Sequence, residues 1–275
     1  MNTSMDTRKF PINRTSAPCR RTPDTGLVAL CPPAKFITLY NLTTRESHMP
    51  PRSTPISTAE FEQLRAGARL LERDYRGEKV LLTPDNHIIK LFYPRRKFTS
   101  ARIYPYAYRF WNNARQLQQR GIITIRCEQL RHDRQNRRHL VTYPLLPGTT
   151  LRDRLAEVRN GDDYLDKLAS YLVTLHAKGI LFRSIHLGNI LVLENGDYGL
   201  IDVADMSIQQ RPLGLIKRAR NFRHLLHDRS DRERLSKYGY GRLLDNYETA
   251  AGISGYRRTL LRSFIRHYAP AMNFA

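Results

Sequence analysis

The chain has 275 residues, and its 46 Lys and Arg outnumber its 25 Asp and Glu to give a formal net charge of +21. A hydrophobic fraction of 41% is ordinary for a globular protein and excludes a chain that is disordered throughout. No apolar stretch approaches the roughly 20 residues that a membrane-spanning helix needs. The cysteines Cys19, Cys31 and Cys127 are too few and too widely spaced for a disulfide framework or a zinc site, which favours a cytoplasmic location.

The positive charge calls for anionic partners. Nucleic acid, anionic lipid, acidic polysaccharide and nucleotide phosphates all qualify on charge alone. The chain carries no helix-turn-helix, zinc or RNA-binding signature, so we predict no specific nucleic-acid partner. We expect the protein to be a monomer.

Residues 1–55 differ in composition from the rest of the chain. They are rich in Ser, Thr, Pro and Arg and lack a helical or alternating period, so we expect a disordered extension, with an isolated strand over 36–40 at most. An alternative that the sequence leaves open is a natural start at Met49. This segment holds 8 Lys or Arg against 3 Asp or Glu, so most of the charge belongs to the remaining 220 residues.

From residue 56 onwards, apolar periodicity and turn residues predict folded elements. In chain order we expect a helix over 57–71, strands over 79–82 and 87–92, a helix over 106–120, strands over 122–125 and 140–145, helices over 151–155 and 164–178, strands over 190–193 and 198–201, and helices over 203–226 and 231–275. A β-rich part thus precedes a mostly helical part. We predict an α+β fold with two lobes, 56–145 and 146–275, and a binding crevice between them.

The segment from Gly179 to Asp202 is the most informative part of the chain. Asn189 precedes a short strand, an Asn-Gly turn reverses the chain, and Asp202 follows the return strand. Two oxygen ligands at the open ends of one hairpin can share Mg²⁺, which takes few protein ligands and completes its octahedron with phosphate oxygens. Upstream, Lys90 lies in an otherwise apolar strand and needs an anion, a role that a nucleotide phosphate fills.

These residues resemble the catalytic and metal-binding loops of the protein-kinase-like superfamily. Phe182-Arg183-Ser184 stands where kinases have His-Arg-Asp, Asn189 follows Ser184 by five residues, and Asp202-Val203-Ala204 stands for Asp-Phe-Gly. His87-Ile-Ile-Lys90 resembles the Val-Ala-Ile-Lys strand. More narrowly, residues 182–189 and 199–206 are similar to the bacterial lipopolysaccharide-kinase family (the InaA type, including toluene-tolerance proteins), and the resemblance covers about residues 57–270.

The resemblance implies a two-lobed kinase fold with ATP and Mg²⁺ as cofactors. It also implies an anionic acceptor, a sugar hydroxyl of the lipopolysaccharide core, and a cytoplasmic protein peripheral to the inner membrane. By position, Lys90 and Gly77 would bind the nucleotide, and Asn189 and Asp202 would bind both the nucleotide and Mg²⁺. Arg183 would link the catalytic loop to the loop around Asp202.

The sequence departs from the kinase pattern at three places. The catalytic Asp position is Ser184, and a serine hydroxyl does not accept a proton near neutral pH. Gly77 is the one glycine where a glycine-rich phosphate loop is expected. The helix after the first hairpin offers Asn112 and Asn113 but no Glu to pair with Lys90. Alternative readings are therefore a pseudokinase that binds a nucleotide or a partner, and a protein Ser/Thr kinase.

Two further features stand near this block. His186, two residues after Ser184, and Asp205 are candidates to take over the orienting role of the missing Asp. The basic stretches 217–223 and 256–268 either face a phosphorylated acceptor or an anionic membrane, or are solvated helix surfaces.

Overall fold

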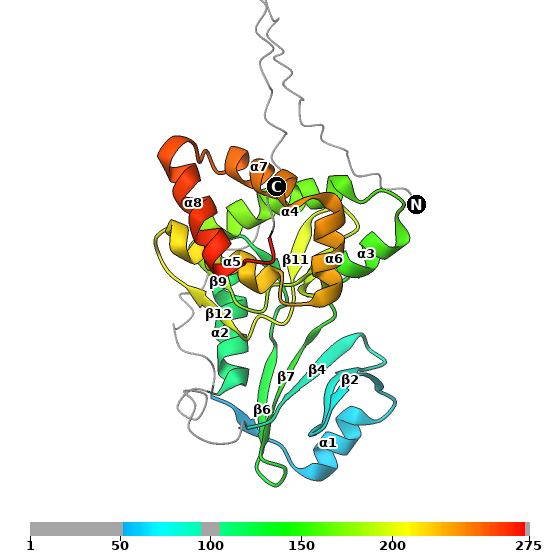
Figure 1. Ribbon diagram of the computed structural model, residues 1–275. Coiled ribbons are helices and arrows are strands. Elements are labelled where there is room, and N and C mark those ends of the chain that lie inside the picture. Colours follow the sequence, from blue (N-terminus) through cyan, green and yellow to red (C-terminus); the bar gives the residue numbers. More distant parts are fainter. Residues whose placement is uncertain (1–51, 95–104, 273–275) are drawn as a thin grey trace, which may run out of the picture. The chain divides into compact units, whose positions relative to one another are not determined.

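The computed structural model describes residues 52–94 and 105–272 (Figure 1). Every described residue belongs to one compact unit, Ser47–Ala275. The expected strand over 36–40, the alternative start at Met49, and Cys19 and Cys31 lie outside the described residues, as does nearly all of the expected extension.

Sheets and helices follow each other as the α+β expectation requires. The strands are β1 Thr54–Pro55, β2 Arg69–Asp74, β3 Gly77–Leu82, β4 His87–Phe92, β5 Ile123–Thr124, β6 Gln129–Asp133, β7 Arg138–Pro144, β8 Thr149–Thr150, β9 Ile180–Phe182, β10 Ile190–Val192, β11 Tyr198–Leu200 and β12 Met206–Ile208. The helices are α1 Thr58–Arg65, α2 Tyr106–Gln119, α3 Leu151–Glu157, α4 Asp162–Ala177, α5 Leu215–Leu225, α6 Arg229–Tyr238, α7 Tyr240–Ala250 and α8 Gly255–Tyr268. None of the helices in the described ranges is long and apolar enough to cross a membrane.

The N-terminal part of the fold is one six-stranded sheet with the order β1-β6-β7-β4-β3-β2. Its central strand β4 pairs antiparallel with β3 and β7, so that Lys90 lies between Val80 and Val141. The hairpin β3–β4 turns at Asn86, whose φ of 59° is one that Asn tolerates better than most residues. This arrangement places Lys90 inside the sheet rather than at an edge.

Two clusters of buried apolar side chains hold the described residues together. The smaller one packs α1 on the sheet through Phe61, Leu81, Ile89 and neighbouring residues. The larger one extends from the other face of the sheet, including Ile88, through α2 into the C-terminal helices. The sheet and the helical part therefore share a continuous core.

The first expected helix is shorter than predicted. α1 begins after Ser57, which forms a capping box with Glu60, but it ends at Arg65 instead of residue 71. Gly67, with φ of 71°, reverses the chain, and the following residues pair with β3 as strand β2. Leu70 and Leu71 are compatible with either a helix or a strand, and the turn at Gly67 favours the strand.

The prediction of a helix over 203–226 is also wrong for the first half of that range. Residues Met206–Ile208 form β12, which pairs antiparallel with β9, and α5 begins only after Gly214. The helix expected over 231–275 is three helices, because Gly239 with φ of 100° and Gly252 with φ of 60° break it. Strands β6 and β9 were not predicted.

Candidate functional site

Lys90 is a buried cation with a defined partner. Its residue is 9% exposed, and its ammonium nitrogen lies 3.0 Å from Oδ1 of Asp202 and 5.7 Å from the ring centroid of Phe110. A charge this well buried needs a counter-ion, and Asp202 provides it from 112 positions further along the chain. The structure thus brings together two of the residues that the sequence placed at the nucleotide phosphates.

Asn189 joins this pair through the β10–β11 hairpin. The backbone amide of Ile201 donates to the carbonyl of Asn189 at 3.1 Å, which fixes Asn189 opposite the residue before Asp202. The side-chain amide of Asn189 donates to the carbonyl of Ser184 at 2.8 Å. Its amide oxygen accepts no hydrogen bond from the described residues, which leaves it available as a ligand.

Asp202 adopts a backbone conformation that is unusual for a residue with a side chain. Its φ of 51° is in the left-handed region, which costs a non-glycine residue on the order of 1 kcal/mol or more. The Asn113 side chain on α2 donates to the carbonyls of Val203 and Ala204 at 2.8 and 3.2 Å and so holds the two following residues in place. The helix that lacks an acid therefore contacts the loop after Asp202 with an amide.

Arg183 and Ser184 follow strand β9. The guanidinium of Arg183 lies 2.7 Å from the Asp205 carboxylate, and the backbone amide of Arg183 donates to the Asp205 carbonyl at 3.0 Å. The link between the two loops that the family resemblance implies for Arg183 is therefore present in its geometry. Ser184 is half-buried, and its carbonyl is the acceptor for Asn189.

His186 lies against a buried ion pair. Its Nδ1 is buried and has no hydrogen-bond partner among the described residues. Burial, reinforced by the charge of Arg152, lowers the pKa of His186, so the ring is neutral near pH 7. The neutral ring can bind a proton at Nδ1.

The loop that carries His186 is anchored by Asp231, a residue that the sequence did not single out. Asp231 is fully buried, accepts from Nε and Nη2 of Arg152 at 2.8 and 3.0 Å, and accepts from the backbone amide of Leu187 at 2.8 Å. A carboxylate that is fully satisfied in this way fixes its donors in place. Nothing in the local sequence around Arg152 or Asp231 signals a pairing across 79 positions.

Lys90, Asn189 and Asp202 all line one cavity of about 470 Å³. Lys90, Asn189 and Asp202 lie at its polar part, and the apolar part includes Val80, Ile88, Ile125, Tyr143, Leu191 and Ile201. This combination fits a nucleotide, whose base needs an apolar surface and whose phosphates need charged groups. Gly77 is the first residue of β3 and does not line this cavity.

The ligand types also fit a magnesium ion held jointly with phosphates. The described residues contain no group of three or more His, Cys, Asp or Glu that could hold a metal by itself. One amide oxygen and one carboxylate, from Asn189 and Asp202, fit the few protein ligands that Mg²⁺ takes when substrate phosphates supply the others.

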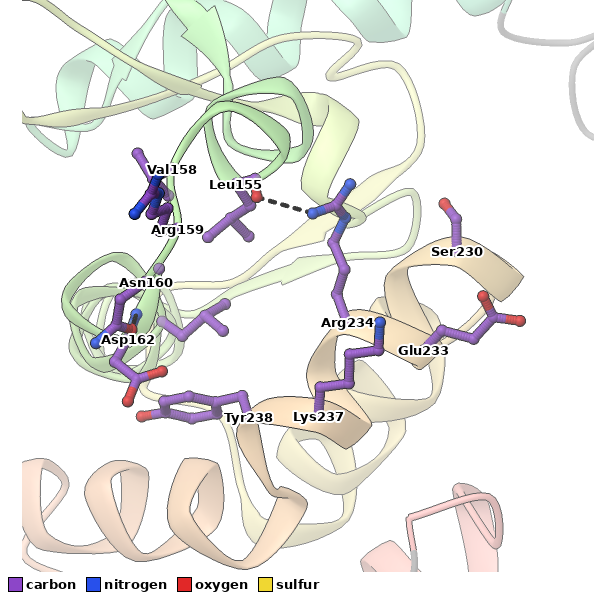
Figure 2. Close-up of a pocket in the computed structure, with 12 residues that line it drawn as sticks. Leu155, Val158, Arg159, Asn160, Asp162, Ser230, Glu233, Arg234, Lys237 and Tyr238 are labelled. Atoms are coloured by element: carbon purple, nitrogen blue, oxygen red, sulfur yellow. Dashed lines mark hydrogen bonds between the residues drawn. The ribbon is translucent and has the colours of Figure 1, made fainter.

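A second cavity of about 400 Å³ lies away from these residues, between the α3–α4 connection and α6 (Figure 2). Arg234 donates to the carbonyl of Leu155 at 2.9 Å across it, and Lys237 lies beside Arg234. The sequence motifs contribute no residue to this cavity. Its lining mixes acids and bases without a buried cluster that selects one ligand.

Comparisons with known proteins give distant matches of fold only. No protein-family model and no curated protein matches the chain. Among solved structures, the bifunctional kinase-methyltransferase WbdD is similar at a TM-score of 0.42 and 14% identity over 68% of this chain, and WbdD with the kinase inhibitor LY294002 at 0.42 and 17% over 70%. A divergent kinase lacking the glycine-rich loop, which regulates membrane ultrastructure of the Toxoplasma parasitophorous vacuole, is similar at 0.41 and 15%, with 81% of this chain and 83% of that chain covered.

The chain spans less than half of the WbdD chains, 46% and 43% in the two structures. Similarity at this level concerns the kinase-like fold and says nothing of activity or substrate. Function has to be inferred from the residues around Lys90 and Asp202 themselves.

Proposed function

We propose that the chain is an ATP-dependent phosphotransferase that binds its nucleotide with Mg²⁺ in the cavity beside Lys90. The observation that carries this proposal is the meeting of Lys90, Asn189 and Asp202 in a cavity whose other lining residues are mostly apolar. A buried lysine, an amide oxygen and a carboxylate are the groups that neutralise and orient a polyphosphate.

Each residue of the site has a task in this proposal. Lys90 would donate to phosphate oxygens, and Asn189 and Asp202 would be the protein ligands of the metal. Bound ATP and Mg²⁺ supply the phosphoryl group and its charge neutralisation. Ser184 can orient an acceptor hydroxyl by hydrogen bonding but cannot take its proton, so the rate depends on positioning.

The acceptor that we propose is a sugar hydroxyl of the lipopolysaccharide core, with the protein at the cytoplasmic face of the inner membrane. Support comes from the similarity of residues 182–189 and 199–206 to lipopolysaccharide kinases. A protein hydroxyl is the alternative acceptor. The fold itself favours neither.

A second candidate function is that of a pseudokinase, and Ser184 is the observation that favours it. Two carboxylates near Ser184 in the described part of the chain are engaged elsewhere, since Asp205 pairs with Arg183 and Asp231 pairs with Arg152. Such a protein would bind a nucleotide and turn over none.

Calorimetric binding of Mg-ATP to wild type, Asp202→Asn and Asp197→Asn tests the site. Asp197 lies in the turn of the same hairpin and is the matched control, because its carboxylate faces Lys167 rather than the cavity. We expect Asp202→Asn to weaken Mg-ATP binding at least about tenfold, the effect of losing one charged contact, and Asp197→Asn to leave it unchanged. Equal affinities for all three proteins contradict the metal assignment.

Turnover separates the two candidate functions. ADP release that depends on core oligosaccharide, or on a protein acceptor, identifies a phosphotransferase and its acceptor class. Tight Mg-ATP binding without ADP release on either acceptor identifies a pseudokinase.

A further inference from the structure

The packed helices α5 and α8 carry charge of one sign only. Each has four Lys or Arg, and neither contains an Asp or Glu. The two helices lie side by side in Figure 1 and pack against each other. Because acidic side chains are common on other helices of this protein, such as α4 and α7, the positive charge is concentrated at this part of the surface.

Some of these cations are engaged within the fold. Arg258 and Arg262 of α8 bind Asp245 and Glu248 of α7. Arg218 of α5 donates to the carbonyl of Leu213 at 2.8 Å. The other basic residues of the two helices contact no carboxylate in the parts of the chain that the structure describes; these are Lys217, Arg220, Arg223, Arg257 and Arg266.

Lys217 lines an apolar depression, and Arg220 and Arg257 lie one and two helical turns from residues that line it. A cavity of about 410 Å³ opens between the start of α5 and α8 and is lined by Leu215, Ile216, Lys217 and Phe264, among others. Arg257 precedes Phe264 by two helical turns and so lies on the same side of α8. Arg220 follows Ile216 by one turn, and its guanidinium is 6.0 Å from the ring centroid of Tyr268.

We refer to this surface as the α5–α8 groove. It consists of Ile216, Lys217, Arg220, Arg257, Phe264 and Tyr268. Its apolar component reaches the surface, since Ile216 is 48% exposed. An exposed isoleucine close to cations that pair with no carboxylate among the described residues fits a partner that offers both anions and hydrocarbon.

We propose that the α5–α8 groove docks on an anionic phospholipid membrane. Lipid phosphates complement Lys217, Arg220 and Arg257, and the acyl boundary receives Ile216 and the apolar depression. A nucleic acid would match the cations but would leave Ile216 exposed, because its backbone offers no hydrocarbon. This proposal concerns a surface outside the nucleotide cavity and does not depend on nucleotide binding.

The test is sedimentation of the full chain with vesicles of phosphatidylcholine alone and of equal parts phosphatidylcholine and phosphatidylglycerol. We expect binding to the anionic vesicles only. Each basic residue near such a surface contributes about fivefold, so Lys217→Ser/Arg220→Ser/Arg257→Ser weakens binding on the order of 100-fold. Ile216→Ser weakens it about tenfold through its apolar contribution.

The matched control removes the same number of charges elsewhere. Arg134→Ser/Arg159→Ser/Lys237→Ser changes three exposed cations that make no ion pair with the described residues. We expect it to bind anionic vesicles within about threefold of wild type, the residual effect of net charge. Thermal melts and Mg-ATP affinity verify that each variant is folded.

Two results overturn the proposal. Equal losses in the groove and control variants mean that net charge alone attracts the vesicles. An Ile216→Ser variant that binds like wild type, together with tighter binding of wild type to a duplex oligonucleotide than to vesicles, identifies the groove as a nucleic-acid surface. If wild type does not bind Mg-ATP, the proposed function is contradicted. The vesicle measurements still test the α5–α8 groove, because they do not depend on the nucleotide.

Discussion

The strand that leads into Ser184 is held by buried polar contacts between residues far apart in the sequence. The side-chain amide of Asn221 on α5 donates to the carbonyl of Phe182 at 2.7 Å, and its oxygen meets Nε2 of His176 at 2.9 Å. The other ring nitrogen of His176 lies 2.7 Å from the Tyr247 hydroxyl. Three helices thus fix the strand that leads into Ser184.

This network makes stability depend on pH. Burial lowers the pKa of His176 to about 4, below the usual value of about 6.5. Because the folded-state pKa is depressed, the neutral ring is stable in the fold above pH 6.5, and the free energy of unfolding falls as the pH drops from there toward 4. Between pH 7 and pH 5 we expect wild type to lose about 2 kcal/mol from this residue.

Urea unfolding at the two pH values measures the effect. His176→Gln keeps a side chain that can hydrogen-bond but does not titrate, so its loss should be smaller than that of wild type by about 2 kcal/mol. His267→Gln, on the exposed side of α8, is the control and should follow wild type. Parallel curves for wild type and His176→Gln would show that His176 does not carry the pH dependence. His139, His186 and His224, whose pKa values burial also lowers, remain in all three proteins and add a loss of the same sign.

The sequence signals some of the contacts around Asp202 and Ser184 and not others. Lys90, Asn189 and Asp202, which the motif spacing assigned to one site, lie together in the structure, and the hairpin between the last two is local with a readable Asn-Gly turn. Motif spacing gives no signal for Arg152 and Asp231, because their pairing depends on how α3 and α6 pack. The roles of Ser184 and His186 stay predictions.

Among the elements, α2 has the clearest functional consequence. It brings Asn113 to the loop after Asp202, where the amide serves two carbonyls. Removing the donor leaves those buried carbonyls unsatisfied, which costs about 1–3 kcal/mol. The loop then fixes Asp202 less firmly.

We therefore expect Asn113→Ala to lower the free energy of unfolding by about 1–3 kcal/mol and to weaken Mg-ATP binding by about fivefold, the equivalent of about 1 kcal/mol. Asn112→Ala, one residue earlier on the same helix, is the control and should change either quantity by less than about 0.5 kcal/mol. Urea titration and calorimetry give the two readouts. Similar losses in both variants would mean that helix propensity, rather than the contact with Val203 and Ala204, decides the outcome.

Elements with local signals were predicted well, and elements defined by distant partners were not. β3, β4 and α2 are close to their expected bounds because a turn, an alternating run or a terminal glycine marks each one. β9 and β12 have three residues each and form by pairing with each other. Strands this short have no apolar periodicity from which the sequence could predict them. The helix expected over 203–226 failed for the same reason.

At the scale of the molecule, the shared core determines how the protein unfolds. The larger apolar cluster includes Ile88 and Val141 of the sheet as well as Leu172 and Leu243 of the helices. A core that continues across both parts favours a single cooperative transition. The chain's one tryptophan, Trp111 on α2, packs against this cluster and reports on the region between sheet and helices.

We expect tryptophan fluorescence and far-ultraviolet circular dichroism to give the same melting temperature, and Mg-ATP to raise both together. A ligand at about 100 times its dissociation constant stabilises the folded state by about 2.7 kcal/mol, which for a domain of this size is a shift of about 5–10 °C. Chelating Mg²⁺ should remove most of the shift, because Asn189 and Asp202 then have no ion to share with the phosphates. Two separate transitions, with Mg-ATP moving only one, would show that the sheet and the helices fold independently and that the nucleotide does not bind between them.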